Sequence, residues 1–205
     1  MKKSPSTSKI VLSIVALAAV AVLIVVIILK DGDTAVKKHL QADLENFLDT
    51  EIQIPELSRA MLNGRDTLLE INHSPAARMI IFYDSTVCGS CKILQIRHWQ
   101  PLVDLAKFTE NKFEPLFIFA PSGKDEVDVK KALIVYTFEW PVFIDRSQKL
   151  IASNPELPKN KLLHTFLLDK DNRVVLAGEP MANPELWGLY VSAIRELIAD
   201  AGVLE

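Results

Sequence analysis

The residues best suited to chemistry are the protein's two cysteines, Cys88 and Cys91, which are spaced C-x-x-C. An apolar run of strand length, 79–83, precedes them, and a helical pattern follows. Unpaired N–H groups and the helix dipole stabilise an anion where a helix begins, so the sequence predicts a favoured thiolate at Cys88. Cys91, one turn further on, can then resolve a mixed disulfide. The pattern predicts thiol–disulfide exchange through a redox-active Cys88–Cys91 disulfide, with no other cofactor.

Other chemistries remain open for the same pair. A purely structural disulfide would close a very short loop and gain little from unfolded-state entropy, although a non-catalytic binding module could still carry one. Zinc would need two more ligands, and the sequence has no second C-x-x-C. Copper held by Cys88, Cys91 and His164 is a further alternative. Asp84 precedes the pair and is either a proton acceptor or a solvated loop residue.

The elements that must position the cysteines alternate along the chain. Strands are expected at 79–83, 116–119, 142–144, 161–168 and 173–176, and helices after Cys91, at 124–137 and from Asn183 to about Ala201. Pro101 is expected to kink the first of these helices, and 51–54 to form a short edge strand. Residues 169–172 are typical of a hairpin turn. This order predicts an α/β fold with a mixed central sheet flanked by helices.

A membrane anchor is expected near the amino terminus. Residues 10–29 are apolar apart from Ser13, and a helix of that length spans about 30 Å, the thickness of a bilayer core. The lysines in the short flank 1–9 favour a cytoplasmic amino terminus with the rest of the chain outside. The expected organisation is therefore a cytoplasmic 1–9, a transmembrane helix 10–29, a juxtamembrane helix or linker 30–50, and a domain 51–205.

The charge balance excludes one class of partner. The formal net charge is -3, and no basic face is evident that could neutralise phosphates. We expect no binding to nucleic acid. The lipid bilayer is the partner expected for residues 10–29.

Three segments resemble the thioredoxin-like superfamily, in its membrane-anchored TlpA/ResA-like branch. They are MIIFYDSTVCGSCKILQ (79–95), EWPVFIDRSQKL (139–150) and HTFLLDKDNRVVLAG (164–178). Their order and spacing agree with the family over roughly residues 51–200. The resemblance implies a thioredoxin-like domain on the periplasmic side of a bacterial inner membrane. It also implies protein thiols or disulfides as substrates, together with a redox donor that the sequence does not identify.

The resemblance further implies which residues line the active-site groove beside the cysteines. Val87 stands where the family has an aromatic residue, and Gly89-Ser90 separates the cysteines. Phe82 stands where many members have a buried acid. Leu163-His164 occupies the place of the family's cis-proline, which lies against the disulfide and helps to keep metals away. A trans peptide is expected there, because a non-proline cis bond costs about 3–4 kcal/mol.

Overall fold

The structure is a computed structural model that describes residues 36–71, 75–84, 96–121 and 125–202. The chain divides into two compact units, Met1–Asp43 and Leu44–Glu205. A helix over 36–47 crosses the boundary between them and lies within the range predicted for a juxtamembrane helix. Among the described residues, no helix has the length and apolar character needed to cross a bilayer. The predicted flank 1–9 and span 10–29 lie outside these residues.

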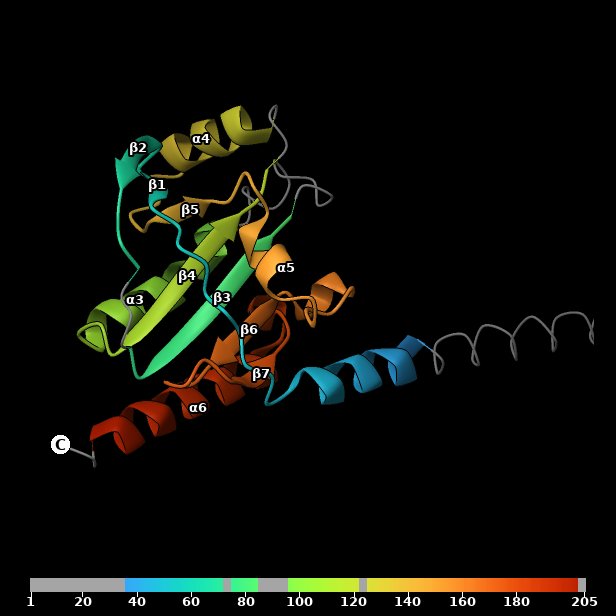
Figure 1. Ribbon diagram of the computed structural model, residues 1–205. Helices are drawn as coiled ribbons and strands as arrows, with labels where there is room; N and C mark the ends of the chain where they lie inside the picture. Colours follow the sequence, from blue (N-terminus) through green and yellow to red (C-terminus); the bar gives the residue numbers. More distant parts are fainter. Residues whose placement is uncertain (1–35, 72–74, 85–95, 122–124, 203–205) are drawn as a thin grey trace, which may run out of the picture. The chain divides into compact units, whose positions relative to one another are not determined.

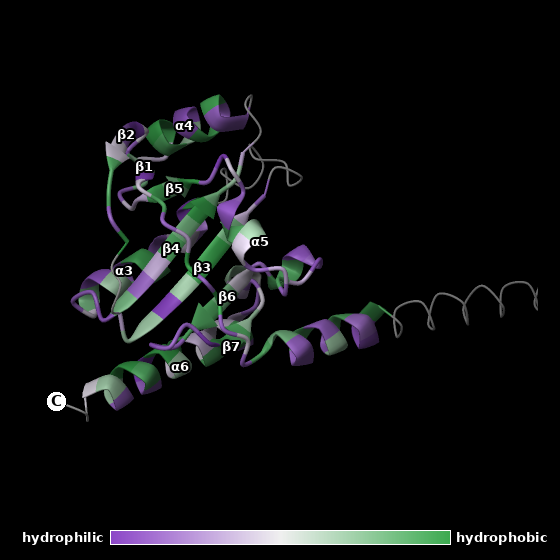
Figure 2. Cartoon of the chain, in the orientation of Figure 1, coloured by the Kyte–Doolittle hydropathy of each residue, from purple (hydrophilic) through white to green (hydrophobic). Residues whose placement is uncertain are grey.

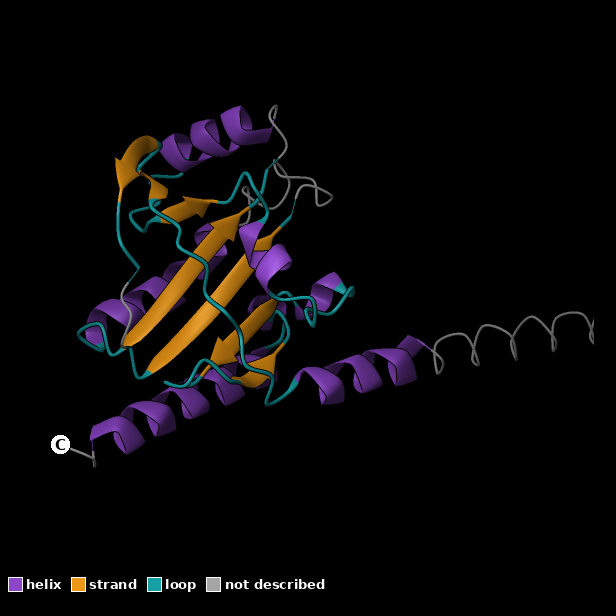
Figure 3. Ribbon diagram, viewed as in Figure 1, coloured by secondary structure: helices purple, strands orange, loops and turns teal. Residues whose placement is uncertain are grey.

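Within the described residues of the second unit, seven strands form one mixed sheet (Figures 1 and 3). The strands are β1 (Arg59–Leu62), β2 (Arg65–Leu68), β3 (Ala77–Tyr83), β4 (Phe113–Phe119), β5 (Val142–Ile144), β6 (Thr165–Leu168) and β7 (Val174–Ala177). Their order is β2-β1-β5-β4-β3-β6-β7. Strands β3, β4 and β5 are parallel, and the remaining pairs are antiparallel. The predicted mixed sheet is confirmed.

Helices flank this sheet, as predicted. They are α3 (Gln100–Phe108), α4 (Asp125–Val135), α5 (Lys149–Ser153) and α6 (Pro184–Gly202), with 3-10 turns η1 (Ile96–Trp99), η2 (Lys161–Leu163) and η3 (Pro180–Ala182). Asn183 caps α6 as predicted, because its Oδ1 accepts hydrogen bonds from the N–H groups of Glu185 and Leu186, both at 3.1 Å.

Strand β3 is buried along its whole length, and Figure 2 shows apolar colour over β5 and over the carboxyl-terminal parts of β3 and β4. Met79 and Tyr83 belong to the core cluster that includes residues of α3 and α6. Ile80 alternates to the opposite face, with its cross-strand partner Phe166. On that face Phe47 packs edge-on against Phe166, with ring centroids 5.1 Å apart. The compact domain therefore uses residues that precede position 51.

Two predictions about elements beside the sheet are wrong, the kink at Pro101 and the strand over 161–168. Pro101 is the second residue of α3, where a kink was expected, and it fits there because an N–H is not needed in the first turn of a helix. The predicted strand 161–168 is divided into η2 and β6. The side chain of Asn160 caps η2 by accepting a hydrogen bond from the N–H of Leu162 at 3.1 Å, which favours a turn over a strand.

The edge strand predicted at 51–54 is also wrong, since only Glu51 forms an isolated bridge, with Arg173. A hairpin of β1 and β2 lies at the far end of the sheet and was not predicted. Its turn is Asn63-Gly64, with φ of 50° and 69°, as tight hairpins with both central residues at positive φ require. A Cβ on Gly64 would lie 2.1 Å from Cγ1 of Ile134, so the turn also needs glycine to approach α4.

Candidate active site at the carboxyl end of strand β3

Strand β3 ends at Tyr83, and Asp84 follows it. The next residues, 85–95, are called the cysteine segment here because they contain Cys88 and Cys91. The predicted site residues of this segment, Val87, Cys88, Gly89, Ser90 and Cys91, lie outside the described residues. The structure does describe the residues around the two points where the chain enters and leaves this segment.

The predicted groove residues Leu163 and His164 lie beside the entry to the cysteine segment. The carbonyl of His164 accepts a hydrogen bond from the N–H of Phe82 at 3.0 Å, and the next residue, Thr165, pairs with Ile81. Leu163 and His164 are both buried. All described peptide bonds are trans, which confirms the expectation for this position. Residues far apart in the sequence are thus brought together near the end of β3, and the groove beside the cysteines stays a prediction.

Among the described residues, one nitrogen of the His164 imidazole has a hydrogen-bond partner and the other has none. Nε2 lies 2.9 Å from the carbonyl oxygen of Pro158. A carbonyl only accepts, so Nε2 carries the hydrogen and Nδ1 carries a lone pair. Nδ1 is buried and has no hydrogen-bond partner among the described residues. The ring also lies against Phe82, with centroids 5.4 Å apart.

Burial lowers the pKa of His164 below its ordinary value of 6.5. The hydrogen bond to the Pro158 carbonyl and the charge of Asp84 act in the opposite direction, and the charge of Lys161 lowers the pKa further. His164 is therefore neutral near pH 7. A neutral imidazole with an unshared Nδ1 lone pair can accept a proton or bind a metal ion.

Asp84 is held by an ion pair with Lys161, at 2.9 Å between Oδ1 and Nζ. The carboxylate is only 12% exposed, so the interpretation as a solvated loop residue does not fit it. Because Lys161 belongs to η2, the pair joins the end of β3 to the turn that carries Leu163. A carboxylate paired with an ammonium group is a weaker base, and the role of Asp84 as a proton acceptor stays a prediction.

Tyr83 and Trp99 were not predicted, yet they link the entry and the exit of the cysteine segment. Nε1 of Trp99 donates a hydrogen bond to the Tyr83 hydroxyl oxygen at 3.2 Å, and both residues are buried. Burial raises the pKa of Tyr83 strongly, the charge of Glu179 raises it further, and the Trp99 bond lowers it. Tyr83 therefore stays protonated. The sequence signal that could have identified this pair is an aromatic residue with a polar group on each side of the C-x-x-C.

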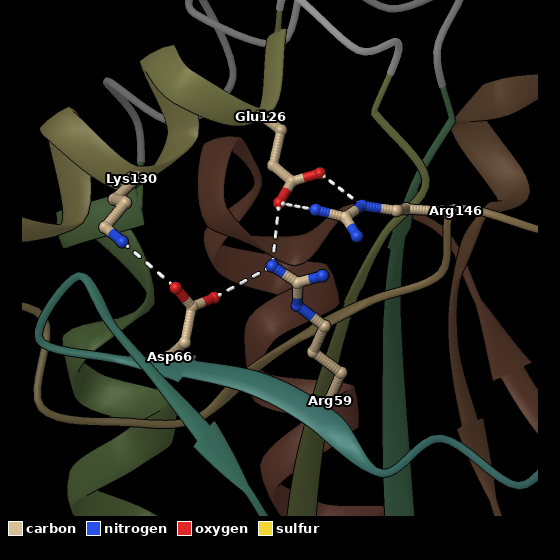
Figure 4. A network of polar contacts seen from close by, with 5 residues as sticks. All are labelled: Arg59, Asp66, Glu126, Lys130 and Arg146. Carbon is tan, nitrogen blue, oxygen red and sulfur yellow. Dashed lines mark hydrogen bonds and ion pairs between the residues drawn. The ribbon is translucent and has the colours of Figure 1, made fainter.

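A second polar cluster lies at the carboxyl end of β5 (Figure 4). Arg146 follows that strand and contacts both carboxylate oxygens of Glu126, with Nε at 2.6 Å from Oε2. Arg59 joins Glu126 to Asp66, which also binds Lys130 at 3.0 Å. The Arg146 bonds hold the pKa of Glu126 below its usual range. The cluster connects α4 to the β1–β2 hairpin and to the residue that follows β5.

This geometry offers no complete metal site of its own. Across 36–71, 75–84, 96–121 and 125–202, no three His, Cys, Asp or Glu side chains are grouped so that they could hold an ion. The copper alternative would therefore require Cys88 and Cys91 in addition to His164.

The lowered pKa of His164 predicts a specific dependence of stability on pH. Between the lowered pKa and 6.5, the unfolded chain binds this proton and the folded chain does not, so the free energy of unfolding falls as the pH drops below 6.5. The contribution is at most about 1.4 kcal/mol per pH unit. Urea unfolding between pH 5 and 8 should show a shallower pH dependence for His164→Gln than for the wild type.

His98→Gln is the matched control, because His98 is exposed on η1 and should leave the slope unchanged. If His164→Gln and the wild type have the same slope, His164 is not a buried neutral imidazole.

No family model matches the sequence, and no curated protein matches it. Among solved structures, a protein assigned as the thiol:disulfide interchange protein DsbE of Chlorobium tepidum matches with a TM-score of 0.50 and 16% identity, over 72% of this chain and 99% of that chain. A thioredoxin-like protein from Porphyromonas gingivalis matches with a TM-score of 0.45 and 16% identity, over 74% and 95% of the two chains. Peroxiredoxin Q of Xanthomonas campestris gives 0.46 and 17%, over 75% and 99%. At these identities the likeness concerns the fold. Together with the mixed sheet and its flanking helices, it identifies the domain of this chain as a thioredoxin-like fold.

Proposed function

We propose that the protein is a thiol–disulfide oxidoreductase whose reactive pair is Cys88 and Cys91. The observation that carries the proposal is the position of the C-x-x-C in the chain. It follows the end of β3, an inner strand of the sheet, after residues 84–87, and the predicted groove residue His164 contacts the same strand end. Parallel strands present their carboxyl ends at one edge, where α/β proteins commonly bind ligands.

The proposed reaction has two steps. The Cys88 thiolate attacks a disulfide of a protein substrate, which forms a mixed disulfide and releases one substrate sulfur as a thiolate that takes up a proton. The Cys91 thiolate then attacks Cys88, which releases the second substrate sulfur. The substrate has gained two electrons and two protons, and the protein holds a Cys88–Cys91 disulfide. A redox donor, which we do not identify, returns the pair to the dithiol.

Leu163 and His164 would line the substrate groove together with Val87, Gly89 and Ser90. The support is the contact of His164, which follows Leu163 in the chain, with Phe82 near the end of β3. Asp84 would accept a proton only once its ion pair with Lys161 opens. The substrate that suits such a groove is an extended segment of a protein that carries a disulfide.

Replacing the two cysteines separately tests the order of the steps. With the full chain and insulin as substrate, Cys88→Ser should reduce disulfide cleavage to the uncatalysed background, because the attacking sulfur is lost. Cys91→Ser should instead accumulate a mixed disulfide at Cys88, visible by mass spectrometry without reductant. Exchange that survives in Cys88→Ser would exclude Cys88 as the nucleophile.

We also propose that residues 10–29 anchor the protein in a bacterial inner membrane, with 1–9 in the cytoplasm and the domain in the periplasm. The support is the apolar run itself, which is long enough to span a bilayer core. Deleting residues 1–30 should move the protein from the carbonate-washed membrane fraction to the soluble fraction. Protease added to spheroplasts should degrade the anchored domain. A domain that is protected until the spheroplasts are lysed would contradict the orientation.

A copper-handling protein is the second candidate, because the Nδ1 lone pair of His164 is buried without a partner among the described residues. Soft thiolates and a neutral imidazole suit Cu(I). Calorimetry of the reduced full chain with Cu(I) should then give binding tighter than about micromolar. His164→Gln should weaken that binding by about 10–100-fold, whereas His98→Gln should leave it unchanged. Equal affinities in His164→Gln and the wild type would remove His164 as a ligand.

A further inference from the structure

The two edges of the sheet differ in how the described residues cover them. At one edge the segment 49–52 binds β7, since the N–H of Asp49 donates to the carbonyl of Val174 at 2.8 Å and the N–H of Val174 donates to that of Thr50 at 3.0 Å. At the other edge β2 pairs with β1 alone, and no described strand lies beyond it (Figure 1). Such an edge presents backbone groups that a further strand can bind.

The register of the β1–β2 hairpin determines which backbone groups face this open edge. The N–H of Leu69 donates to the carbonyl of Ser58 at 3.0 Å, so Leu69 directs its backbone groups toward β1. The hydrogen-bonding direction alternates along a strand of an antiparallel pair. The N–H and C=O groups of Asp66 and Leu68 therefore point away from β1, and no strand of the described chain pairs with them.

The side chains of β2 do little to keep a further strand away. Exposed edges are commonly protected by proline, by a bulge or by an unpaired lysine. The strand has the sequence RDTL, and its register with β1 is continuous. The carboxylate of Asp66 is occupied by Arg59 and Lys130, at 3.1 and 3.0 Å (Figure 4). Leu68 is 80% exposed, so the edge offers an apolar side chain beside a neutralised charge.

We propose that β2 pairs with β2 of a second copy of this chain, antiparallel and across a two-fold axis, so that the two sheets join into one. Two-fold dimers are the commonest homo-oligomers, and their interface uses the same surface of both copies. An axis perpendicular to the sheet makes the two copies of β2 antiparallel, as this pairing requires. It also keeps each face of one sheet continuous with the same face of the other.

Charge selects one register for this pairing. Outward-facing residues must meet outward-facing residues, which allows an axis at Asp66, at Thr67 or at Leu68. An axis at Asp66 would place two carboxylates opposite each other, and an axis at Leu68 would place Asp66 opposite Glu70. Like charges in opposite positions are destabilising. With the axis at Thr67, Asp66 exchanges N–H···O=C bonds with Leu68 of the second copy. The two threonines then form a cross-strand pair that is favourable in sheets.

Helix α4 offers further apolar surface beside this edge. It lies along the hairpin, because Lys130 binds Asp66 and the side chain of Ile134 lies against Gly64 (Figure 1). Val127 and Ile134 are 54% and 56% exposed. The two-fold axis places both copies of α4 on the same face of the joined sheet. A strand of four residues buries little surface alone, so α4 must supply part of the roughly 1,200 Å² that a stable interface needs.

A single cysteine at the proposed axis tests the register directly. Thr67→Cys is introduced into the full chain together with Cys88→Ser and Cys91→Ser, so that the new thiol stands alone. In the proposed register the two copies of position 67 are a non-hydrogen-bonded pair with Cα atoms about 4.5 Å apart, within the range of a disulfide. Oxidation with diamide in a mild detergent should convert most of the protein to a covalent dimer on a non-reducing gel.

Arg65→Cys in the same background is the matched control, because it lies in the same strand and on the same face as Thr67. The two copies of position 65 would be separated by about 13 Å along the strand direction, which is too far for a disulfide. It should therefore remain monomeric on the gel.

A second measurement tests the surface without a cysteine. Leu68→Glu places a carboxylate opposite Asp66 on both sides of the axis and removes an apolar contact. The dissociation constant of the dimer, from light scattering of the full chain in detergent, should rise about tenfold or more. Leu189→Glu makes the same change at a leucine that is 57% exposed on α6, and it should leave the dissociation constant unchanged.

Three results would overturn the pairing. A wild type that is monomeric at every concentration would leave the edge free for a strand of another protein. Equal cross-linking of Thr67→Cys and Arg65→Cys would reject the register. A dimer as stable in Leu68→Glu as in the wild type would place the contact elsewhere in the chain, residues 10–29 included. If Leu68→Glu does not fold, the comparison of the two cysteine variants decides.

Discussion

Strand β3 is held by hydrogen bonds on both sides and buried on both faces, and the site depends on this constraint. Parallel β4 pairs with it along its whole length, and antiparallel β6 pairs with Arg78–Ile81. A slip of one residue would move every side chain to the other face of the sheet, so the register is strongly specified. That register directs Tyr83 toward Trp99, Phe82 toward His164, and Asp84 toward Lys161.

Among the described residues, the other buried side-chain polar atoms have hydrogen-bond partners. Arg78 in β3 binds Glu114 at 2.9 Å and Asn172 at 3.2 Å. Asp145 accepts from the N–H groups at the start of α5, and Asn154 pairs with the backbone of Gln53. Among the described residues the Nδ1 atom of His164 is the exception. A buried acceptor that finds no partner at all costs about 1–3 kcal/mol, so this atom, which lies near the end of β3, calls for an explanation.

The polar contacts around this edge orient elements more than they stabilise the domain. Arg146, Arg59 and Lys130 are substantially exposed, so each of their ion pairs contributes about 0–1 kcal/mol. They nevertheless join α4, the β1–β2 hairpin and the end of β5. On the other side of β3, the better shielded Asp84–Lys161 pair joins the strand end to η2. Polar contacts therefore lie on both sides of the point where the chain leaves β3 and enters the cysteine segment. Such an arrangement suits the proposed exchange between two sulfurs.

The sequence by itself determined the α/β class, strand 142–144, the hairpin at 169–172 and the cap at Asn183, because periodicity and capping act over a few residues. It also identified the cysteine pair and, through family resemblance, Leu163-His164. Only the tertiary structure decided that Tyr83 meets Trp99, that the His164 Nδ1 has no partner among the described residues, and that Pro101 lies in the first turn of α3. It also revealed the hairpin of β1 and β2, whose strands carry charged residues and lack apolar alternation. The Tyr83–Trp99 pair and the surroundings of His164 arise from contacts between residues that lie apart in the chain, which local patterns do not encode. The position of Pro101 and the Asn63-Gly64 turn follow local rules.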